Sequence, residues 1–471
     1  MNSLGLIATA VTRGRSVHRG ASRLSRIGGA TAALSLLLTG GGMAAAPSSA
    51  FAFLTTAPQT SVSQSSQRVV GPLSGLGFAT RYAADLDAAT TALAALSPAE
   101  VATLWNELPK DYRSALVDGR AEIIGNLAGV PYLDRAIANE SRLPELQRSA
   151  EDDLQRALQS SRSTGADSQG ELLVAHAADR LEAITLLVNR YASGAPTPSD
   201  VPHYLIELDA TVQGPPLVAV AVGDLDSASF ASFFVPGMNS SVLQLPDYLR
   251  GVERMQEASD DSAVVLWLGY ESPGPVDTVS TLHAEAGSVR LGRALAGYDA
   301  VRDATGLRAE LSVLGHSYGS TTAALTLASG SFGVSSFVMI GSAGLPSSLS
   351  ITDLHVRTER VYVTQAREDA LADSGRFWSG RINPADPGWG AQFFGSDGTT
   401  LSDGTVLAAV KAHDAVGASH KFDHDKYLGD GTESLYDIRK IITGQCHDVT
   451  PDSRLISRDA TLLADGAGTI P

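Results

Sequence analysis

The chain has 471 residues, of which 44% are hydrophobic and 18% charged, and its formal net charge is −16. This length allows a large core and about two domains, and the acidic balance disfavours nucleic acid as a partner because the chain would repel phosphates. The single cysteine, Cys446, excludes an intramolecular disulfide and a cysteine-based metal site, and we interpret it as a buried or idle thiol.

The N-terminal segment differs from the rest of the chain. Basic residues precede an apolar run over residues 27–38, and a small-residue stretch then leads to Ala50-Phe51-Ala52. This pattern predicts a secretory signal peptide over residues 1–52 with cleavage near Ala52, and the apolar run is too short and interrupted for a comfortable membrane span. An organelle transit peptide or an uncleaved anchor are the alternatives. We therefore expect a protein that is secreted or associated with the cell envelope.

Residues 53–84 are predicted to be a flexible linker, because their first part is rich in Ser, Thr and Gln. Residues 85–200 then indicate a helical region. Ser97-Pro98-Ala99-Glu100 is a capping box, and residues 171–189 carry apolar side chains at helical spacing. The apolar, Gly-punctuated stretch 123–131 fits either a loop laid across a cleft or a packed connection between helices.

From residue 201 to residue 445 short β-rich runs alternate with helical stretches. Most of the later runs are unbroken apolar segments, which is typical of strands buried on both faces of a parallel sheet. The first two, joined by Gly214-Pro215-Pro216, indicate an antiparallel hairpin at the sheet edge. We predict an α/β fold with a doubly wound, mostly parallel sheet, and a C-terminal tail over residues 446–471. The predicted strands are 204–208, 217–222, 232–235, 263–268, 310–314, 336–340 and 360–364.

One β-rich run ends in Gly315-His316-Ser317-Tyr318-Gly319 and passes directly into a helix-forming run. Strand, tight turn and helix together are typical of a nucleophile elbow, in which small flanking residues leave the serine hydroxyl exposed. The N-terminus of the following helix favours developing negative charge at the same point. The bare motif is weak, and an ordinary Gly-rich turn is the alternative.

A serine nucleophile needs a base, and the base needs an orienting acid, which follow it in the chain order Ser, acid, His. Asp369 is the expected acid because it comes just after the second strand beyond the elbow; Glu368 and Asp373 compete with it, and Asp353 and Asp386 are less well placed. For the base, the histidines downstream of Ser317 are His355, His413, His420, His424 and His447. Three of them, His413, His420 and His424, lie in a polar stretch just before the final predicted helix, 433–442, and sequence logic alone does not separate His420 from His424.

The oxyanion hole requires two backbone N–H groups. We expect one from Tyr318 and the other from Met238, with Gly237 next in line, because residues 233–239 form an apolar strand followed by a Pro-Gly turn. A plain turn is the alternative there. Tyr270 and Trp267 are expected near the mouth of the pocket.

Two further segments carry weaker signals. The aromatic residues between positions 376 and 395 fit either a lid over an apolar acyl pocket or loop aromatics packed on the core; they are Phe377, Trp378, Trp389, Phe393 and Phe394. A metal site at residues 420–425 is disfavoured because no third ligand is evident. We expect no metal and no cofactor.

Several motifs occur together in an order that resembles a known family. They are 235–238 (VPGM), 267–273 (WLGYESP), 315–320 (GHSYGS), 340–344 (IGSAG) and 424–427 (HDKY), with 124–131 (IGNLAGVP) in the helical part. This set resembles the largely actinobacterial α/β-hydrolase family catalogued as domain of unknown function 1023. The resemblance implies an α/β-hydrolase fold preceded by helices, Ser317 as nucleophile and His424 as base. The family usually has serine where this chain has Asp425.

We predict a secreted serine hydrolase that cleaves carboxylic, preferably apolar acyl, esters through an acyl-enzyme on Ser317, with His424 as general base and Asp369 as orienting acid. Its partner would be a small-molecule or lipid ester. A peptidase or amidase that uses the same triad stays open. The rival hypothesis is a catalytically inert binding or cell-envelope protein on the same fold. A cofactor-dependent enzyme is disfavoured because no Gly-x-Gly-x-x-Gly follows the first strands.

Overall fold

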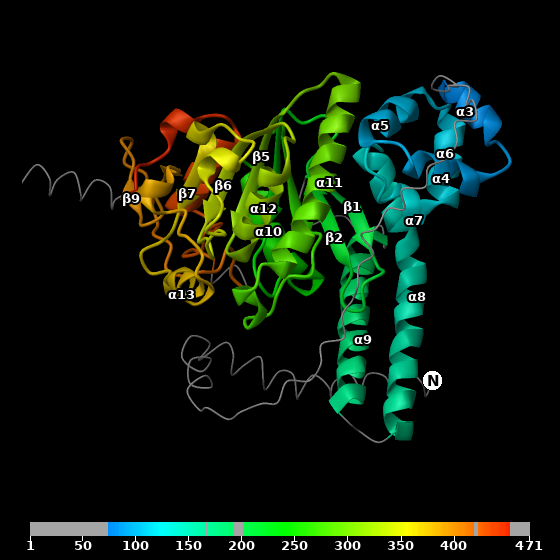
Figure 1. Ribbon diagram of the computed structural model, residues 1–471, viewed down its shortest axis with the longest axis horizontal. Helices are drawn as coiled ribbons and strands as arrows, with labels where there is room; N and C mark the ends of the chain where they lie inside the picture. The colour runs from blue at the N-terminus through cyan, green and yellow to red at the C-terminus, as the bar shows by residue number, and fades with distance from the viewer. Residues whose placement is uncertain (1–73, 165–167, 193–200, 419–422, 453–471) are drawn as a thin grey trace, which may run out of the picture. The chain divides into compact units, whose positions relative to one another are not determined.

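The computed structural model describes residues 74–164, 168–192, 201–418 and 423–452, and these belong to one compact unit (Figure 1). The predicted signal peptide, its cleavage site near Ala52, most of the predicted linker, His420 and most of the predicted tail lie outside the described residues. Among the helices of the described chain, none combines the length and the apolar character that a membrane span needs.

The first part of the described chain is helical, as the sequence predicts. Ser97 and Glu100 form the predicted capping box, in which the Glu100 carboxylate accepts from the Ser97 N–H at 2.8 Å. The helices begin earlier than predicted, because α3 lies inside the range that we expected to be a linker. The helices are α3 (Gly75–Arg81), α4 (Leu86–Ala94), α5 (Pro98–Glu107), α6 (Lys110–Gly119), α7 (Ala121–Ile124), α8 (Tyr132–Thr164) and α9 (Ser168–Leu187), with a π-helical turn at Val188–Ala192.

The second part is built on an eight-stranded sheet with the order β1-β2-β4-β3-β5-β6-β7-β8. β1 and β2 form the predicted antiparallel hairpin at the sheet edge, β2 also runs antiparallel to β4, and the remaining pairs are parallel. The strands are β1 (His203–Asp209), β2 (Leu217–Val222), β3 (Phe230–Val235), β4 (Ser262–Leu268), β5 (Glu310–His316), β6 (Val334–Ile340), β7 (Val361–Thr364) and β8 (Gln392–Phe393), and a small separate hairpin pairs β9 (Thr399–Thr400) with β10 (Val406–Leu407).

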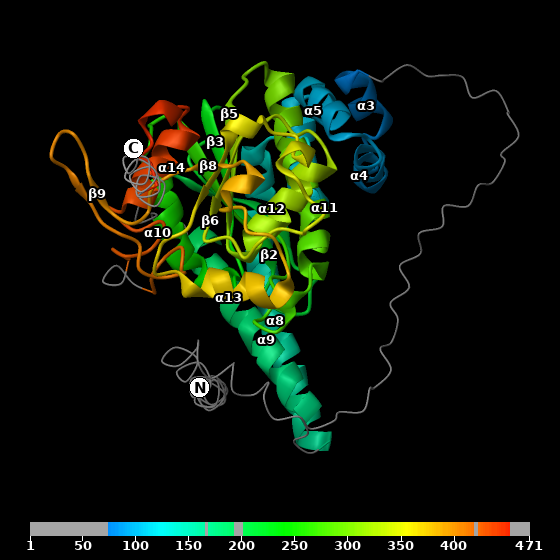
Figure 2. The same cartoon turned by 60° about the vertical axis from the view of Figure 1, so that its left-hand side comes forward.

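Helices cover both faces of the sheet, which explains why the strands are apolar without alternation. Neighbouring residues of β5 enter different clusters: Val313 packs with side chains of α11 (Leu282–Thr305) and α12 (Tyr318–Ser329), and Leu314 with those of α10 (Leu245–Gln256) and α14 (Glu433–Ile442). In Figure 2, α10 and α14 lie on one side of the strands and α11 and α12 on the other. A fifth helix, α13 (Ala370–Ser379), follows β7. The fold class is the predicted one, a doubly wound α/β fold with a mostly parallel sheet.

Side chains of the helical region close the outer edge of β1. Asn126 accepts from the Leu208 N–H at 2.9 Å and donates to the Leu208 carbonyl at 3.1 Å. Asn139, which is fully buried on α8, donates to the carbonyls of Leu205 at 3.1 Å and Gly125 at 2.8 Å. Of our two hypotheses for residues 123–131, the packed connection is therefore the one that the structure supports.

Replacing Asn139 tests how much this edge contributes to stability. Asn139→Ala should lower the free energy of unfolding by about 1–3 kcal/mol, because two buried carbonyls lose their donor. Denaturant unfolding of the purified chain measures the difference. Asn106→Ala is the control, since Asn106 is exposed on α5 and its replacement should change stability by no more than about 0.5 kcal/mol. Equal stability of the two variants would contradict the assignment.

Candidate active site

Ser317 stands on a sharp turn between β5 and α12, as the elbow pattern predicts. Its backbone has φ 53° and ψ −123°, and within the described residues only one other non-glycine residue, Asn239, has a positive φ. A non-glycine residue in this region of backbone space costs about 1–3 kcal/mol and needs surrounding structure to hold it there. Two hydrogen bonds to the end of β6 do so, from the Ser317 N–H to the Ile340 carbonyl at 3.1 Å and from the Ala343 N–H to the Ser317 carbonyl at 3.2 Å.

The flanking glycines are required by the space around the turn. A Cβ on Gly319 would overlap the carbonyl oxygens of Val235 and Pro236, and a Cβ on Gly315 would overlap the backbone of Ser320. A Cβ on Gly237 would lie 2.6 Å from the Ser317 Cβ. The loop after β3 therefore runs directly against the serine, and only glycine permits so close an approach.

A histidine and an aspartate complete a hydrogen-bonded chain from the serine. His413 Nε2 lies 2.7 Å from Ser317 Oγ, and His413 Nδ1 lies 2.8 Å from Asp369 Oδ1 and 3.0 Å from Asp369 Oδ2. Because the carboxylate accepts at Nδ1, the proton of a neutral ring belongs there and Nε2 is free to accept the serine proton. Ser317 and Asp369 thus stand where the sequence places them.

The histidine is not the one that we expected. His424 lies in an exposed turn, and within the described chain it makes no hydrogen bond to Ser317 or Asp369. The cause is its neighbour Asp423, which is fully buried and forms ion pairs with Arg254 at 2.9 Å and Arg250 at 3.4 Å on α10. This anchor turns the adjacent His424 towards solvent. The structure therefore corrects the predicted base from His424 to His413.

Sequence reasoning kept His413 among the histidines before the final helix, but the residues around it do not single it out. Lys411 and Asp414 lie close to His413, just as Asp423 and Asp425 flank His424, so both histidines stand in charged sequence. Val410 and Ala415 are buried in the core and fix the backbone on either side of His413. The assignment of His413 therefore rests on its contacts with Ser317 and Asp369.

Asp369 is the N-cap residue of α13 and accepts from three donors. Oδ1 accepts from the Ala372 N–H at 3.1 Å and Oδ2 from the Tyr427 hydroxyl at 2.8 Å, in addition to the His413 contact. Burial acts to raise the pKa of Asp369, but the contacts with His413, Ala372 and Tyr427 outweigh it and hold this pKa below its usual value. The carboxylate is therefore kept ionised beside the imidazole.

The competing acids lie elsewhere. Glu368 is exposed, and Asp373 is bound by Gln365 and Arg376 on the exposed side of α13. Asp353 caps the short turn at Ile351–Asp353, and Asp386 caps the one at Pro387–Trp389. None of these four carboxylates is within hydrogen-bond reach of His413 in the described structure.

Two buried side chains that sequence reasoning did not assign hold the triad in place. The Tyr427 hydroxyl donates to Asp369 and accepts from the Ala366 N–H at 2.9 Å. His316, next to the serine, has Nε2 2.7 Å from the His413 carbonyl. Burial and then the nearby His413 charge lower the pKa of His316 to about 3, so its ring is neutral and Nε2 donates. This hydrogen bond connects the turn at Ser317 to the backbone of His413.

Two backbone N–H groups are available beside Ser317 for a developing oxyanion. Tyr318 is the first residue of α12, and an N–H in that position has no partner within its own helix. Met238 follows the Gly237 contact, and no partner for its N–H is found within the described chain. Asn239 and Ser240 secure the loop through bonds to the Pro273 carbonyl at 3.1 Å and the Gly237 carbonyl at 2.7 Å.

Tyr270 and Trp267 do not line the mouth of a pocket, which corrects our expectation. Both are buried in the core on the α11 side of the sheet, and their rings stack with centroids 5.8 Å apart. The Tyr270 hydroxyl donates to the Pro236 carbonyl at 2.8 Å. This hydrogen bond supports the loop that carries Met238. Gly287 on α11 leaves the space in which the Tyr270 ring packs.

The aromatic residues between positions 376 and 395 were expected either to form a lid or to pack on the core, and the structure shows both buried and exposed members. Phe394 is buried, and Phe393 and Trp389 pack against the core. Phe377 and Trp378, in contrast, are exposed on α13. Only this pair is available to contact a ligand or a surface.

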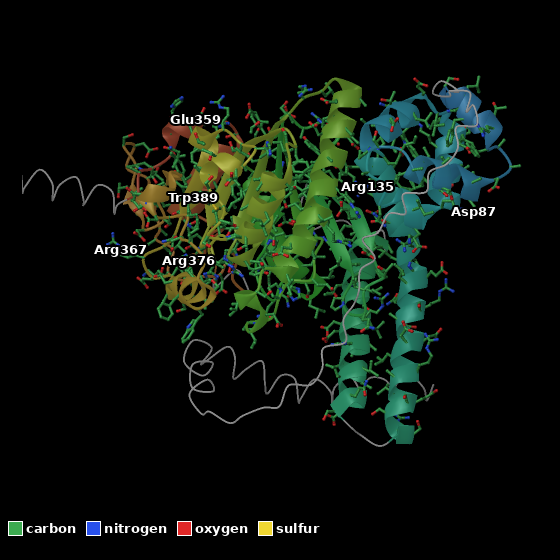
Figure 3. The ribbon with its side chains drawn as sticks, viewed as in Figure 1. Asp87, Arg135, Glu359, Arg367, Arg376 and Trp389 are labelled. Carbon is green, nitrogen blue, oxygen red and sulfur yellow. The ribbon has the colours of Figure 1, made fainter. Side chains whose placement is uncertain are left out.

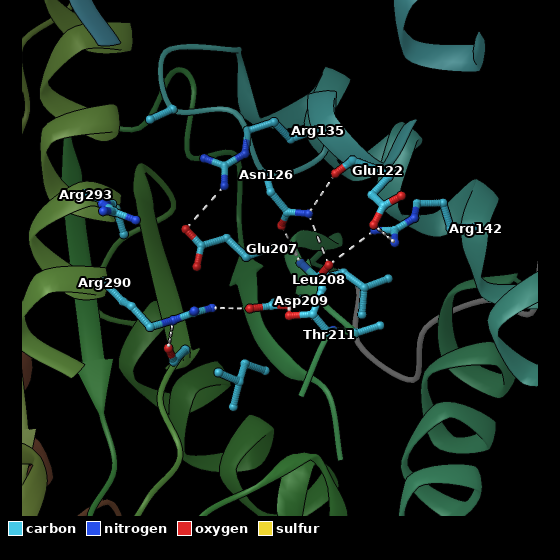
Figure 4. Close-up of a pocket in the computed structure, with 15 residues that line it drawn as sticks. Glu122, Asn126, Arg135, Arg142, Glu207, Leu208, Asp209, Thr211, Arg290 and Arg293 are labelled. Carbon is cyan, nitrogen blue, oxygen red and sulfur yellow. Dashed lines mark hydrogen bonds and ion pairs between the residues drawn. The ribbon is translucent and has the colours of Figure 1, made fainter. Parts of the chain in front are cut away.

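A polar cavity of about 360 Å³ lies between the helical region and the end of β1 (Figure 4). Most of its charged side chains pair with one another, as Arg290 does with Asp209 at 2.7 Å and Arg135 with Glu207 at 3.2 Å. None of the three triad residues lines it. Elsewhere, the described residues contain no group of three or more His, Cys, Asp or Glu side chains that could hold a metal ion.

Comparisons with known proteins agree with this fold. A family model described as alpha/beta hydrolase matches residues 212–378, a range that includes Ser317 and Asp369 and ends before His413. Two curated proteins of Mycobacterium tuberculosis, uncharacterized proteins MT2140 and Rv2079, are each 28% identical over 380 residues. The match covers 76% of this chain and 57% of each relative, so the chain spans little more than half their length.

Similar solved structures include a dienelactone hydrolase from Anabaena variabilis, at 15% identity and a TM-score of 0.31, which covers 54% of this chain and 100% of that one. An esterase from Pyrobaculum calidifontis has 16% identity and a TM-score of 0.32, and covers 57% of this chain and 92% of that one. The family model and the strand order confirm the predicted α/β-hydrolase fold. The narrower family, domain of unknown function 1023, stays a prediction.

The space around Gly319 can be tested directly. Gly319→Ala should destabilise the chain by about 1–3 kcal/mol or distort the turn, because the added methyl group overlaps two carbonyl oxygens. We expect loss of labelling of Ser317 by a fluorophosphonate together with a lower unfolding midpoint. Gly214→Ala is the control, since nothing lies within 4 Å of a Cβ at that position. Wild-type labelling and stability in Gly319→Ala would contradict this account of the elbow.

Tyr427→Phe tests the support of Asp369. Removing the hydroxyl deprives Asp369 and the Ala366 N–H of a buried partner, which should cost about 1–3 kcal/mol of unfolding free energy at pH 7 and lower kcat with little change in KM. Tyr436→Phe is the control, because the Tyr436 side chain is only partly buried on α14.

The pH dependence of this difference has a defined sign. The pKa of Asp369 is depressed in the folded chain, so its contribution to stability is present above the unfolded value of about 3.9 and is lost as the pH falls through the folded value. Tyr427→Phe removes part of that depression. Urea unfolding should therefore show a larger difference from wild type at pH 7 than well below about pH 3.9, at the lowest pH at which both chains still fold, and a difference that grows towards low pH would refute the assignment.

Proposed function

We propose that this chain is a serine hydrolase that cleaves carboxylic esters through an acyl-enzyme on Ser317, with His413 as general base and Asp369 as the acid that orients it. The observation that carries the proposal is the unbroken hydrogen-bonded chain from Ser317 Oγ through His413 to Asp369. The α/β-hydrolase fold and the strained backbone of Ser317 support it, because both are typical of enzymes that present an exposed nucleophile at the carboxyl end of a sheet.

In the first half of the proposed reaction, Ser317 Oγ attacks the ester carbonyl carbon while His413 Nε2 takes the hydroxyl proton. Asp369 accepts the hydrogen bond from His413 Nδ1 and stabilises the positive ring that results. The Tyr318 and Met238 N–H groups are suited to bind the oxyanion of the tetrahedral intermediate. When the intermediate collapses, the ester C–O bond breaks and His413 returns the proton to the departing alcohol.

In the second half, water replaces the alcohol. His413 Nε2 takes a proton from the water as its oxygen attacks the acyl carbon, and the new intermediate expels Ser317, which regains its proton from His413. The products are a carboxylic acid and the free enzyme. We propose esters with an apolar acyl group as the preferred substrates, because the helix that Asp369 caps exposes the large apolar side chains of Leu371, Phe377 and Trp378. Export, as predicted from the leader sequence, belongs to the same proposal.

Three alanine variants test the assignment of the triad. Ser317→Ala and His413→Ala should each reduce kcat/KM on a p-nitrophenyl ester by about 10³-fold or more and abolish labelling by a fluorophosphonate. His424→Ala is the matched control and should remain within about twofold of wild type, since its side chain is exposed.

Other outcomes would point elsewhere. Activity that survives in His413→Ala and is lost in His424→Ala would return the base to our first prediction. A folded wild-type chain that neither labels nor hydrolyses esters would favour the inert binding or envelope protein. Faster turnover of an amide than of the matched ester would favour the peptidase or amidase.

A further inference from the structure

Two short segments at the carboxyl edge of the sheet expose large apolar side chains. One is the loop between β4 and α11 together with the first residue of α11, and the other is α13. We call these side chains the apolar rim, and their exposed fractions range from 41% to 84%. The rim consists of Val276, Val279, Leu282, Leu371, Phe377 and Trp378. Side chains of this size rarely gather on a soluble surface without a partner.

Both segments are fixed to the elbow. Arg381, just beyond α13, donates to the carbonyls of Thr278 at 2.6 Å and Ser280 at 2.8 Å. The Tyr318 hydroxyl, next to the nucleophile, donates to the same Ser280 carbonyl at 2.7 Å. Asp369 itself begins α13. The apolar rim is therefore connected to Tyr318, which follows Ser317 in the chain, and to Asp369, which accepts from His413.

The side chains of α13 divide by chemistry. Arg376, labelled beside α13 in Figure 3, is buried and donates to Gln365 at 2.7 Å and to the Ser342 carbonyl at 2.5 Å. Arg381 is buried as well. Phe377 and Trp378 take the outer side, where their rings meet edge to face at 5.3 Å. The cations thus turn inward and the aromatic rings turn outward.

The charges left on the outer side are mainly acidic. Asp277 stands between Val276 and Val279, and Asp373 has 70% of its side chain exposed on α13. The exposed cation nearest to Asp369 is Arg367, which pairs with Asp397 at 3.4 Å. With a net charge of −16 over the whole chain, this face would be repelled by an anionic membrane. A neutral or zwitterionic surface carries no such penalty.

We propose that the apolar rim docks the protein onto a neutral or zwitterionic lipid surface, from which an acyl ester passes directly to Ser317. The inference rests on the proposed function, since it names the physical state of the substrate of that same site. A lipid phase fits better than a protein partner, because both segments of the rim are connected to residues that contact or adjoin Ser317 and His413, and a protein seated on them would compete with the ester for the same site. Aromatic and aliphatic side chains of this kind insert at the boundary between headgroups and acyl chains.

Vesicle binding tests the proposal. The full-length Ser317→Ala chain, which does not consume the lipid, is sedimented with phosphatidylcholine vesicles, and its tryptophan fluorescence, to which Trp378 contributes with three other tryptophans, is followed during titration. We expect binding with a blue-shifted emission. Phe377→Ser/Trp378→Ser should weaken sedimentation by about tenfold or more, whereas Val406→Ser, which changes an equally exposed apolar residue on β10, should leave it unchanged. Absence of wild-type binding, or equal binding of the double variant, would overturn the proposal.

A second measurement separates the docking surface from the chemistry. In the active chain, the ratio of hydrolysis of a long-chain ester dispersed in phosphatidylcholine to hydrolysis of p-nitrophenyl acetate should fall about tenfold in the double variant. Binding of vesicles by a chain that hydrolyses neither ester would support docking and reject the proposed function. Binding restricted to phosphatidylglycerol vesicles would overturn the proposal, as would a dimer that depends on Phe377 and Trp378 and excludes lipid.

Discussion

The backbone conformation of Ser317 is the constraint on which the arrangement of the site depends. A serine at φ 53° needs surrounding structure to hold it, and here the Ile340 carbonyl at the end of β6 and the Ala343 N–H in the loop that follows bind its backbone on both sides. The register between β5 and β6 therefore sets the position of the nucleophile, and the glycines around it remove every side chain that would displace it. The regular pairing of β5 with β6 thus compensates for the backbone strain at Ser317.

Asp369 and His413, which continue the hydrogen-bonded chain from Ser317, are also held by several contacts each. Asp369 is at once the N-cap of α13, the acceptor for Tyr427 and the acceptor for His413, so one carboxylate joins a helix, a buried tyrosine and the base. His316 connects the elbow to the carbonyl of His413 from the opposite side. The imidazole is thus held at its ring by Asp369 and at its backbone by the residue that precedes the nucleophile.

Local features of this site follow from the sequence, whereas contacts between distant segments do not. The elbow depends on neighbouring residues, and the final helix, Glu433–Ile442, has the predicted bounds because its apolar spacing is regular. The choice between His413 and His424 depends instead on Arg250 and Arg254, which hold Asp423 from a helix far back in the chain. Tyr270 is similar: its aromatic character is evident, but its bond to the Pro236 carbonyl is a tertiary contact. The spacing of residues within one segment does not predict these contacts between distant segments.

The way in which the sheet ends at β1 has a consequence for how the protein can be divided. The outward backbone groups of β1 are bonded by amide and carboxylate side chains of Asn126, Asn139 and Glu140, and not by another strand. An open edge in that position would offer a template for pairing with a second chain. The helical region therefore covers the open edge of the α/β part. A fragment cut to the α/β part alone would keep Ser317, His413 and Asp369 and yet expose the β1 edge to pairing with a second chain.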